Sequence, residues 1–496
     1  MINLSSFIDF HASRTPERTA IVFGEARISY AALSGRVART GGWLRERDIG
    51  EGDVVAVLMK NSAAFIEIAI AVGYIGAVFL PINFRLSADE VGYIVGNSEA
   101  KLLIADEELA AGAALAGNVV LLDVAAQSDS TRLGSGAEIA ARVVRKPGDL
   151  FRLMYTSGTT DRPKGVMHSY ENFYWKCSDH VVALGLNAGN RLLVTGPLYH
   201  VGAFDLPGMA VLWVGGMLCI LRDFSAEAAL AAIAGEQLDS AWLAPVMTSA
   251  MLAAAPASGL DLTSLRWVIG GGERTPEARI RSFGESFPKA RYIDAYGLTE
   301  TCSGDTLMEA GREIEKIGSV GRALAHVEIA IRNEQGRELP AGETGEICLR
   351  GPKITRGYWK DPAKTQAAFF GDWFRSGDMG YLDADGFLFL TDRLKDMIIS
   401  GGENIASSEV ERVIFELPQV REVAVIGAPD DRWGEKPVAF VVLEPGAELS
   451  LEELRRHCRA KLAAFKAPRD IVVRESLPRN PSGKILKRLL RDEFRS

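Results

Sequence analysis

Cysteine is scarce in this chain, and none of its cysteines is placed for a metal site or a disulfide framework. Cys177, Cys219, Cys302, Cys348 and Cys458 form no CxxC pair, and no histidine lies at ligand spacing from them. We therefore expect buried free thiols in a reducing compartment, because these spacings give little support to a zinc site or a disulfide framework.

Long apolar runs and an excess of basic residues are also lacking. The most apolar stretches, 63–81 and 203–221, are interrupted by Glu67, by Asp205 and by glycine and proline, so neither has the ~20 apolar residues of a membrane span. The segment 1–16 lacks a basic start followed by an apolar run, so we expect no secretory signal and a cytoplasmic protein. The formal net charge of −8 argues against a broad attraction to nucleic acid or to an anionic membrane.

The chain has enough apolar residues for a large core, and they follow an alternating pattern. Of its 496 residues, 47% are hydrophobic and 24% are charged, which is typical of a globular protein. The length predicts roughly three folding units, or one large domain with a smaller one. Short apolar or β-branched runs predict strands at 54–59, 78–82, 150–155, 191–196, 216–221, 240–245, 265–269 and 291–295. Helical patterns lie between them, at 63–75 and from about Ser87 onward, and the Ala-rich segment 107–116 is expected to be a surface helix. This alternation predicts an α/β fold with a large, layered N-terminal domain built from βαβ units.

The helical pattern fades after residue 317. Glycine-punctuated strands at 346–350 and 387–390 predict a β-rich subdomain of about 317–390 within an N-terminal domain of 1–391. A polar, charged stretch at 392–395 follows, and we place a domain boundary there. The remaining 396–496 has its own strands and helices and predicts a small α+β domain.

The strongest local signal is the segment 155–165, which reads Tyr-Thr-Ser-Gly-Thr-Thr-Asp-Arg-Pro-Lys-Gly directly after an apolar strand. Hydroxyl and backbone N–H groups can surround phosphate oxygens, and a lysine ammonium can offset their charge. The segment is not a P-loop, which has a second glycine just before the lysine and a hydroxyl after it. On its own it could equally be a turn without a ligand. As a phosphate loop it would use Thr156, Ser157, Gly158, Thr159, Thr160 and Lys164.

Further motifs accompany this loop in order along the chain. They are Tyr296-Gly297-Leu298-Thr299-Glu300, Ser376-Gly377-Asp378, Arg393-Leu394-Lys395-Asp396 and Pro481-Ser482-Gly483-Lys484. Together the five motifs resemble the core motifs of the adenylate-forming superfamily, which includes acyl-CoA synthetases, luciferases and peptide-synthetase adenylation domains. The resemblance covers almost the whole chain and is closest to the acyl-CoA synthetase branch.

The resemblance implies a two-step, ATP-dependent reaction. A carboxylate would attack the α-phosphorus of ATP to give acyl-AMP and pyrophosphate, and the thiol of coenzyme A would then displace AMP. The implied partners are ATP, coenzyme A and a carboxylic acid, with Mg²⁺ as the metal. We expect no nucleic-acid partner, and the sequence does not decide whether the protein forms a homodimer.

The resemblance also implies roles for individual residues. The implied catalytic residues are Lys484, Glu300 and Thr156, with Glu300 as the magnesium ligand. Further implied ATP or AMP contacts are Gly271, Gly272, Glu273, Asp294, Tyr296, Gly297, Thr299, Asp378 and Arg393. The implied acyl pocket contains His200, Val201, Phe204 and Gly270, and the implied coenzyme A passage and hinge contain Lys395, Ser400, Gly401 and Gly402.

One position departs from the family pattern, and several alternatives stay open. The family usually has glycine where this chain has Asp161, and a carboxylate there would repel a triphosphate unless it points outward or pairs with Arg162. The acid could be a medium- or long-chain fatty acid or an aromatic acid, and an alicyclic acid also stays open. Alternatives to the whole assignment are an adenylation enzyme that loads the phosphopantetheine of a carrier protein, and an inactive nucleotide-binding homologue.

Overall fold

The computed structural model describes most of the chain. The described residues are 3, 5–124, 133, 135–139, 141–156, 163–271, 277–393, 396–400, 403–430, 432–479 and 485–494. They group into two compact units: Met1–Ile317 with Gly321–Glu328 and Arg350–Phe374, and Gly318–Val320 with Ile329–Leu349 and Arg375–Ser496.

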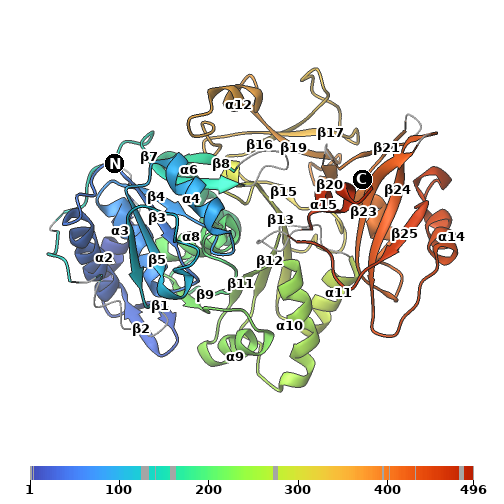
Figure 1. Cartoon of the computed structure of the whole chain (residues 1–496). Helices are drawn as coiled ribbons and strands as arrows, with labels where there is room; N and C mark the ends of the chain where they lie inside the picture. Colours follow the sequence, from blue (N-terminus) through green and yellow to red (C-terminus); the bar gives the residue numbers. More distant parts are fainter. Residues whose placement is uncertain are drawn as a thin grey trace. The chain divides into compact units, whose positions relative to one another are not determined.

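The larger unit contains a nine-stranded sheet in the order β15-β14-β13-β12-β11-β9-β10-β1-β2 (Figure 1). The strands from β13 to β1 run parallel, and β2, β14 and β15 are antiparallel to their neighbours at the two edges. The bounds are β1 (Thr19–Phe23), β2 (Ala26–Ser29), β9 (Arg191–Val194), β10 (Met217–Ile220), β11 (Ser240–Leu243), β12 (Trp267–Gly270), β13 (Arg291–Tyr296), β14 (Thr306–Leu307) and β15 (Arg322–Ala323).

A six-stranded sheet in the order β6-β5-β3-β4-β7-β8 belongs to the same unit. Its strands are parallel except for β8, which is antiparallel to β7 at the edge. The bounds are β3 (Val54–Leu58), β4 (Val78–Pro81), β5 (Leu102–Asp106), β6 (Val119–Leu122), β7 (Leu150–Thr156) and β8 (Lys164–Ser169). The central strands β3, β4 and β5 are buried along their whole length, as expected for parallel strands with both faces covered.

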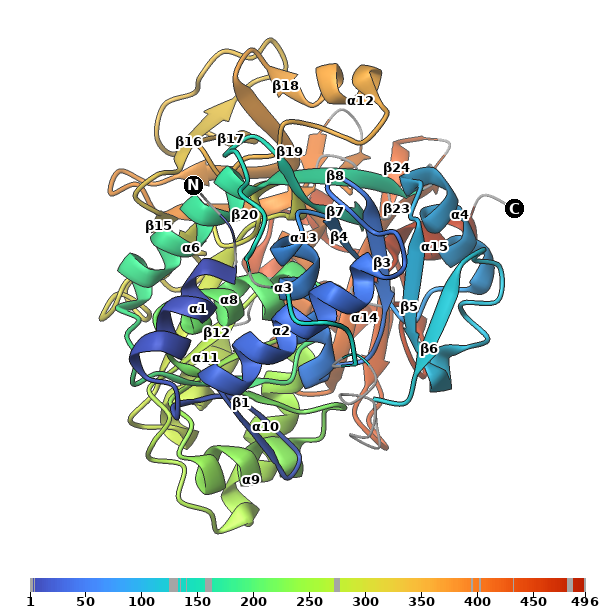
Figure 2. The ribbon, with the colours of Figure 1, turned by 90° about the vertical axis from the view of Figure 1, so that its left-hand side faces the viewer.

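Helices connect and cover these strands. The bounds are α1 (Ser5–Arg14), α2 (Tyr30–Arg45), α3 (Ala63–Tyr74), α4 (Ala88–Ser98), α6 (Tyr170–Leu184), α7 (Val201–Ala203), α8 (Met209–Trp213), α9 (Ala226–Glu236), α10 (Pro245–Ser258), α11 (Glu277–Ser286) and α12 (Pro362–Ala367). Single turns form η1 (Glu107–Leu109), the π-turn η2 (Phe204–Gly208) and η3 (Thr299–Thr301). In Figure 2, α1, α2 and α3 lie side by side, and they are in contact.

Serine residues define where many of these helices begin. The hydroxyls of Ser29, Ser62, Ser87, Ser169 and Ser225 accept hydrogen bonds from backbone N–H groups in the first turns of α2, α3, α4, α6 and α9. A serine in this position satisfies a donor that the helix itself leaves unpaired. The starts of these five helices therefore have a local chemical signal.

A five-stranded sheet follows, in the order β16-β17-β19-β18 with β20 paired to β19. Its strands are β16 (Glu328–Arg332), β17 (Gly345–Arg350), β18 (Phe369–Phe370), β19 (Trp373–Leu382) and β20 (Leu388–Arg393). The last sheet has the order β22-β21-β24-β23, with β25 paired to β24. Its strands are β21 (Ile398–Ser400), β22 (Glu403–Ile405), β23 (Val420–Asp430), β24 (Gly434–Leu443) and β25 (Asp470–Val473).

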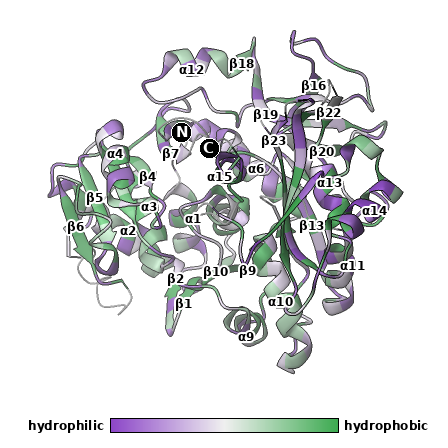
Figure 3. Ribbon diagram, turned by 45° about the vertical axis from the view of Figure 1, so that its right-hand side comes forward, coloured by the Kyte–Doolittle hydropathy of each residue, from purple (hydrophilic) through white to green (hydrophobic). Residues whose placement is uncertain are grey.

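The C-terminal sheet has a small core on each face. One core contains residues of α13 (Ser407–Ile414) and α14 (Leu451–Lys461), and the other contains Leu490 of α15 (Lys487–Asp492). A further turn, η4 (Ala464–Lys466), follows α14. In Figure 3, α14 is largely purple, which fits a helix that packs through one apolar side and presents charged residues on the other.

The predicted α/β fold class is confirmed, with a large N-terminal part and a smaller C-terminal part. The expectation of buried free thiols is also confirmed for all five cysteines. The helix predicted at 107–116 is wrong, because only η1 is helical there and turns follow it. Gly112 falls in the middle of this short segment, and a helix of such length is marginal without packing. Within the described ranges, no helix is long and apolar enough to cross a membrane.

Candidate active site

Several of the residues expected to bind the nucleotide or the acid lie where parallel strands of the larger unit end. Thr156 is the last residue of β7, Gly270 of β12 and Tyr296 of β13. Open parallel sheets bind ligands beyond the carboxyl ends of their strands. Other expected contacts, Ser157, Gly158, Thr159, Thr160, Gly272 and Glu273, lie outside the described residues, as does Asp161.

Lys164, Tyr358 and Glu300 form a linked polar cluster next to the end of β7. Lys164 begins β8 and is the cross-strand partner of Thr156. Its Nζ donates to Tyr358 Oη at 2.7 Å and lies 3.4 Å from Glu300 Oε1. Tyr358 Oη in turn donates to Glu300 Oε1 at 2.9 Å. Burial and the Glu300 carboxylate raise the pKa of Tyr358, so its hydroxyl keeps the proton that it donates.

The cluster has the groups that a nucleotide with a divalent cation requires. The Thr156 Oγ1 atom is buried and has no hydrogen-bond partner in the described part of the chain, so it is available to a ligand oxygen. The described residues contain no metal site built from three or more histidine, cysteine, aspartate or glutamate side chains. Mg²⁺ commonly binds through one or two carboxylates together with substrate phosphates, and Glu300 fits that mode.

The end of β13 and the segment after it bring their backbones very close together. The Tyr296 carbonyl accepts from the Asp305 N–H at 2.7 Å, and the Asp294 carbonyl accepts from the Met308 N–H at 2.9 Å. A Cβ atom on Gly297 would lie 2.3 Å from the Gly304 nitrogen, so only glycine fits at this position. The motif 296–300 therefore has a tightly constrained backbone, and Asp294 and Tyr296 are both buried.

The segment expected to face the acid contacts a tryptophan that the sequence analysis did not identify. His200 precedes α7, accepts the Gly202 N–H through Nδ1, and its ring centroid lies 6.4 Å from that of Trp242 in β11. A Cβ atom on Gly202 would lie 2.3 Å from the Trp242 ring, and a Cβ atom on Gly196 would lie 2.5 Å from it. The indole of Trp242 therefore occupies space that a side chain at position 196 or 202 would block.

The other expected pocket residues have contacts of different kinds. Val201 is buried in α7, and the Phe204 ring packs in an aromatic cluster with Phe65, Phe79 and Phe173. A Cβ atom on Gly270 would overlap Tyr292 Oη at 1.7 Å, so that position admits no side chain. Gly271 has more room, since a Cβ atom built there would lie 3.4 Å from the Ala295 carbonyl oxygen and 3.9 Å from Trp242 Nε1.

In the smaller unit, Asp378 and Arg393 are cross-strand partners in β19 and β20. The Asp378 N–H donates to Ser376 Oγ at 3.0 Å, and Asp378 is largely buried. Ser400 ends β21 and pairs with Glu403 of β22. Lys395, Gly401, Gly402 and Lys484 lie outside the described residues.

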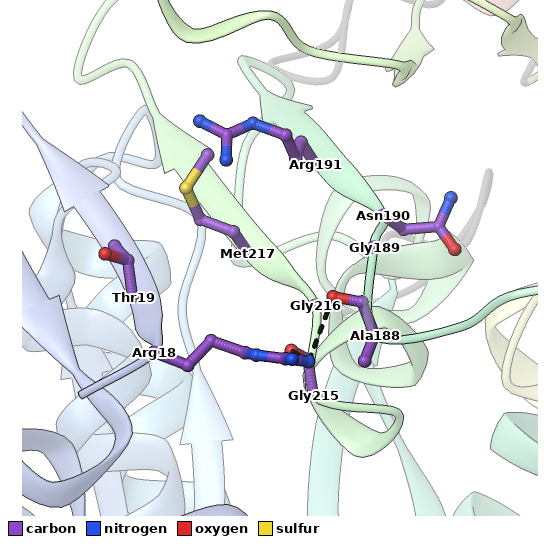
Figure 4. Close-up of a pocket in the computed structure, with 9 residues that line it drawn as sticks. All are labelled: Arg18, Thr19, Ala188, Gly189, Asn190, Arg191, Gly215, Gly216 and Met217. Carbon is purple, nitrogen blue, oxygen red and sulfur yellow. Dashed lines mark hydrogen bonds between the residues drawn. The ribbon is translucent and has the colours of Figure 1, made fainter. Parts of the chain in front are cut away.

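A surface pocket of about 260 Å³ lies at the opposite, N-terminal ends of β9 and β10 (Figure 4). Its two arginines already have partners. Arg18 donates to the carbonyls of Ala188 and Gly215, and Arg191 donates to the Glu236 carbonyl. We assign this pocket no ligand.

Tyr358 and Trp242 are the site residues that sequence reasoning missed. Tyr358 lies in a loop about 58 residues beyond Glu300, and no sequence spacing connects the two. Trp242 is an aromatic residue in an apolar strand, and such a residue is expected to pack in the core. The strand pattern therefore gives no sign that Trp242 lies beside His200. Only their contacts distinguish them.

Comparison with known proteins shows similarity along most of the chain. The model of the AMP-binding enzyme family matches residues 8–359, and that of the AMP-binding enzyme C-terminal domain matches residues 409–484. A feruloyl-CoA synthase of an Amycolatopsis species is 37% identical over 493 residues, covering 97% of both chains. The long-chain-fatty-acid–CoA ligase FadD13 of Mycobacterium tuberculosis is 35% identical, covering 100% of this chain and 99% of the relative.

Solved structures agree with these relatives. The o-succinylbenzoate CoA synthetase of Bacillus subtilis, in complex with its acyl-adenylate intermediate, has a TM-score of 0.90 at 30% identity, covering 99% of this chain and 98% of the other. The anthranilate CoA ligase AuaEII, in complex with anthranoyl-AMP, has a TM-score of 0.91 at 26% identity, covering 99% and 97%. The chain belongs to the AMP-binding enzyme family and is an AMP-forming acid–thiol ligase of the acyl-CoA synthetase type.

Proposed function

We propose that this ligase activates an aromatic acid, with a fatty acid as the second candidate. The observation that carries the choice is Trp242, whose ring lies beside His200 and fills the space that Gly196 and Gly202 leave open. Aromatic side chains favour stacked or edge-to-face contacts with planar groups. Relatives named for feruloyl and for anthranilate substrates support an aromatic acid, and the relative named for long-chain fatty acids supports the alternative.

In the proposed first step, the expected nucleotide contacts hold ATP for attack by the acid. Lys164 and the Thr156 hydroxyl would contact phosphate oxygens, and Glu300 would hold Mg²⁺, which offsets phosphate charge when bound. Tyr358 would orient the Glu300 carboxylate through the hydrogen bond that its hydroxyl donates. Lys484 would bridge the acid and the α-phosphate, and Tyr296 and Asp378 would bind adenine and ribose.

In the proposed second step, the C-terminal domain of 396–496 turns about a hinge at 392–395 relative to an N-terminal domain of 1–391. Ser400, Gly401 and Gly402 would then line the passage for coenzyme A. The two matched family regions, which end at residue 359 and begin at residue 409, support a boundary in this part of the chain.

A substrate screen tests the proposal. The protein is incubated with ATP, Mg²⁺, coenzyme A and a series of cinnamic, benzoic and straight-chain fatty acids, and loss of free thiol is followed. We expect the highest kcat/KM with an aromatic acid. A fatty acid as the best substrate would contradict the aromatic choice, adenylate without thioester would indicate a carrier-protein acceptor, and no pyrophosphate with any acid would indicate an inactive homologue.

A tryptophan variant tests the pocket wall. Because an aromatic pair contributes about 0.5–1.5 kcal/mol beyond its buried area, Trp242→Ala should lower kcat/KM for the best aromatic acid by about two- to tenfold relative to straight-chain acids. Trp267→Ala is the matched control, since Trp267 is equally buried at 8% exposure but lies at the N-terminal end of the neighbouring strand. An equal change of preference in both variants would show that Trp242 does not line the acyl pocket.

We also propose a cytoplasmic location, which the five free, buried cysteines support because disulfides are rare in that compartment. A homodimer is the alternative to a monomer, and sedimentation velocity distinguishes the two.

A further inference from the structure

A fully buried chain of polar groups runs from the acyl segment to the 299–301 turn. Asp205, in η2, accepts two hydrogen bonds from the Arg152 guanidinium, at 2.9 and 2.6 Å. Arg152 Nε and Nη2 lie 3.1 and 2.9 Å from His168 Nδ1, and His168 Nε2 lies 2.7 Å from the Thr299 carbonyl oxygen. The exposed fraction of these three side chains is 1% or less.

The donors and acceptors in this chain have only one consistent assignment. A guanidinium can only donate, so His168 Nδ1 must be an acceptor. The proton of the neutral ring is then on Nε2, which donates to the Thr299 carbonyl. Burial and the Arg152 charge hold the pKa of His168 well below its ordinary value, which agrees with a neutral ring.

The strand arrangement explains why these groups meet. Arg152 and His168 are cross-strand partners in β7 and β8, so their side chains leave the same face of the sheet. Lys164 and His168 are four residues apart in β8 and share a face as well. One strand therefore supplies both the lysine that contacts Tyr358 and the histidine that contacts the turn containing Glu300.

Stability alone does not account for the buried pair of Arg152 and Asp205. Replacing such a pair by apolar side chains is often neutral or stabilising, because two charges lose their hydration when they are buried. The pair is better explained by what it orients. The Thr299 carbonyl is held by His168, and the Glu300 carbonyl accepts from the Thr355 N–H at 2.7 Å, so both peptide groups that flank the Glu300 side chain are fixed.

We propose that Arg152, His168 and Asp205 are positioning residues that tie the acyl segment to the Thr299–Glu300 backbone and so orient Glu300 for Mg²⁺ and ATP. This inference rests on the proposed function of Glu300 and goes beyond it, because none of the three residues needs to touch a substrate. It requires that damage to the chain of hydrogen bonds affects adenylate formation more than thioester formation.

The test compares two substitutions of His168. His168→Leu removes both the acceptor and the donor, whereas His168→Gln keeps one of each. His168→Leu should slow adenylate formation about 10- to 100-fold, and thioester formation from supplied acyl-AMP should stay within about twofold of wild type. His168→Gln should recover most of the loss. His11→Leu is the matched control, since His11 Nε2 also lies 2.8 Å from a backbone carbonyl, that of Trp213 in another part of the unit.

Binding is measured separately from turnover. The thermal stabilisation of each variant by ATP with Mg²⁺ reports binding without any acid, so it distinguishes this inference from the choice of substrate. We expect a smaller stabilisation for His168→Leu than for His11→Leu. If His168→Leu does not fold, Asp205→Asn, which keeps the shape and removes the charge, is compared with wild type in the same assays. Equal loss in both half-reactions, or a His168→Gln variant no better than His168→Leu, would overturn the proposal.

Discussion

The hydroxyl of Tyr358 offers a sharp test of the Lys164–Tyr358–Glu300 cluster. Tyr358→Phe removes one oxygen atom and keeps the ring, which lies 3.9 Å from Lys164 Nζ. The hydroxyl takes part in two hydrogen bonds with charged groups, at 2.7 and 2.9 Å. Such bonds are worth roughly 1.5–3 kcal/mol each when the partner is charged.

The expected loss is smaller than the sum of the two bonds. Lys164 Nζ already lies 3.4 Å from Glu300 Oε1, so the two charges still compensate each other directly in the variant. The side chain of Lys164 is also 29% exposed, and water replaces part of what is lost. We expect a net cost of about 2 kcal/mol to the orientation of Glu300, which slows adenylate formation about 30-fold.

The assay times pyrophosphate release with saturating acid and, separately, thioester formation from synthetic acyl-AMP. Only the first should slow, and the Michaelis constant for ATP with Mg²⁺ should rise. Because the pKa of Tyr358 is raised above its ordinary value, the hydroxyl stays protonated, and the ratio of wild-type to variant rates should not change between about pH 7 and 9.

The matched control is Tyr170→Phe, which removes the hydroxyl of a fully buried tyrosine bound to the Gly73 carbonyl at 3.3 Å. It should leave both half-reactions unchanged. Adenylate formation by Tyr358→Phe at the wild-type rate, or an equal fall of both half-reactions, would refute the orienting role of the hydroxyl.

Three further predictions concern positions outside the described residues. Lys484→Ala should slow adenylate formation about a thousandfold, since a unit charge about 4 Å from a phosphate oxygen is worth roughly 4 kcal/mol, and should spare thioester formation from supplied acyl-AMP; a parallel fall of both steps in stopped assays would contradict this. Lys395→Pro, which restricts the backbone of the proposed hinge, should slow thioester formation far more than adenylate formation, and equal losses would argue against a hinge. Asp161→Gly should lower the Michaelis constant for ATP or leave it unchanged, because it removes a carboxylate from the phosphate loop; a clear rise would mean that the loop needs this side chain.

Local patterns were sufficient to predict most of the parallel strands of the larger unit, namely β3, β4, β7 and β9 to β13. The apolar runs at 54–59 and 191–196 correspond to β3 and β9, and the helix expected from Ser87 begins there with a capping serine. These features depend on neighbouring residues alone, through side-chain alternation and helix capping. The Ala-rich segment 107–116 failed for a related reason, since helical propensity without an apolar face to bury does not maintain a helix.

The family, the reaction class and the candidate nucleotide residues also follow from the sequence by itself. The phosphate loop, Glu300 and Lys484 each stand in a motif whose residue types match the chemistry of phosphate and magnesium, and five such motifs in order are specific. Motifs that directly follow parallel strands lie at the carboxyl edge of the sheet. The sequence alone therefore predicts that the side chains of these motifs lie near one another.

Only the tertiary structure identified Tyr358, Trp242 and the buried chain of Arg152, His168 and Asp205. Arg152 and Asp205 each interrupt an apolar stretch, and the sequence does not show that the two charges belong to one ion pair 53 positions apart. Sheet register sets Arg152 opposite His168, and the ion pair brings Asp205 of η2 to Arg152, so their proposed roles arise from long-range contacts that no local pattern encodes. Local chemistry determined which groups could bind a nucleotide, and the pairing of distant strands decided which groups hold them in position.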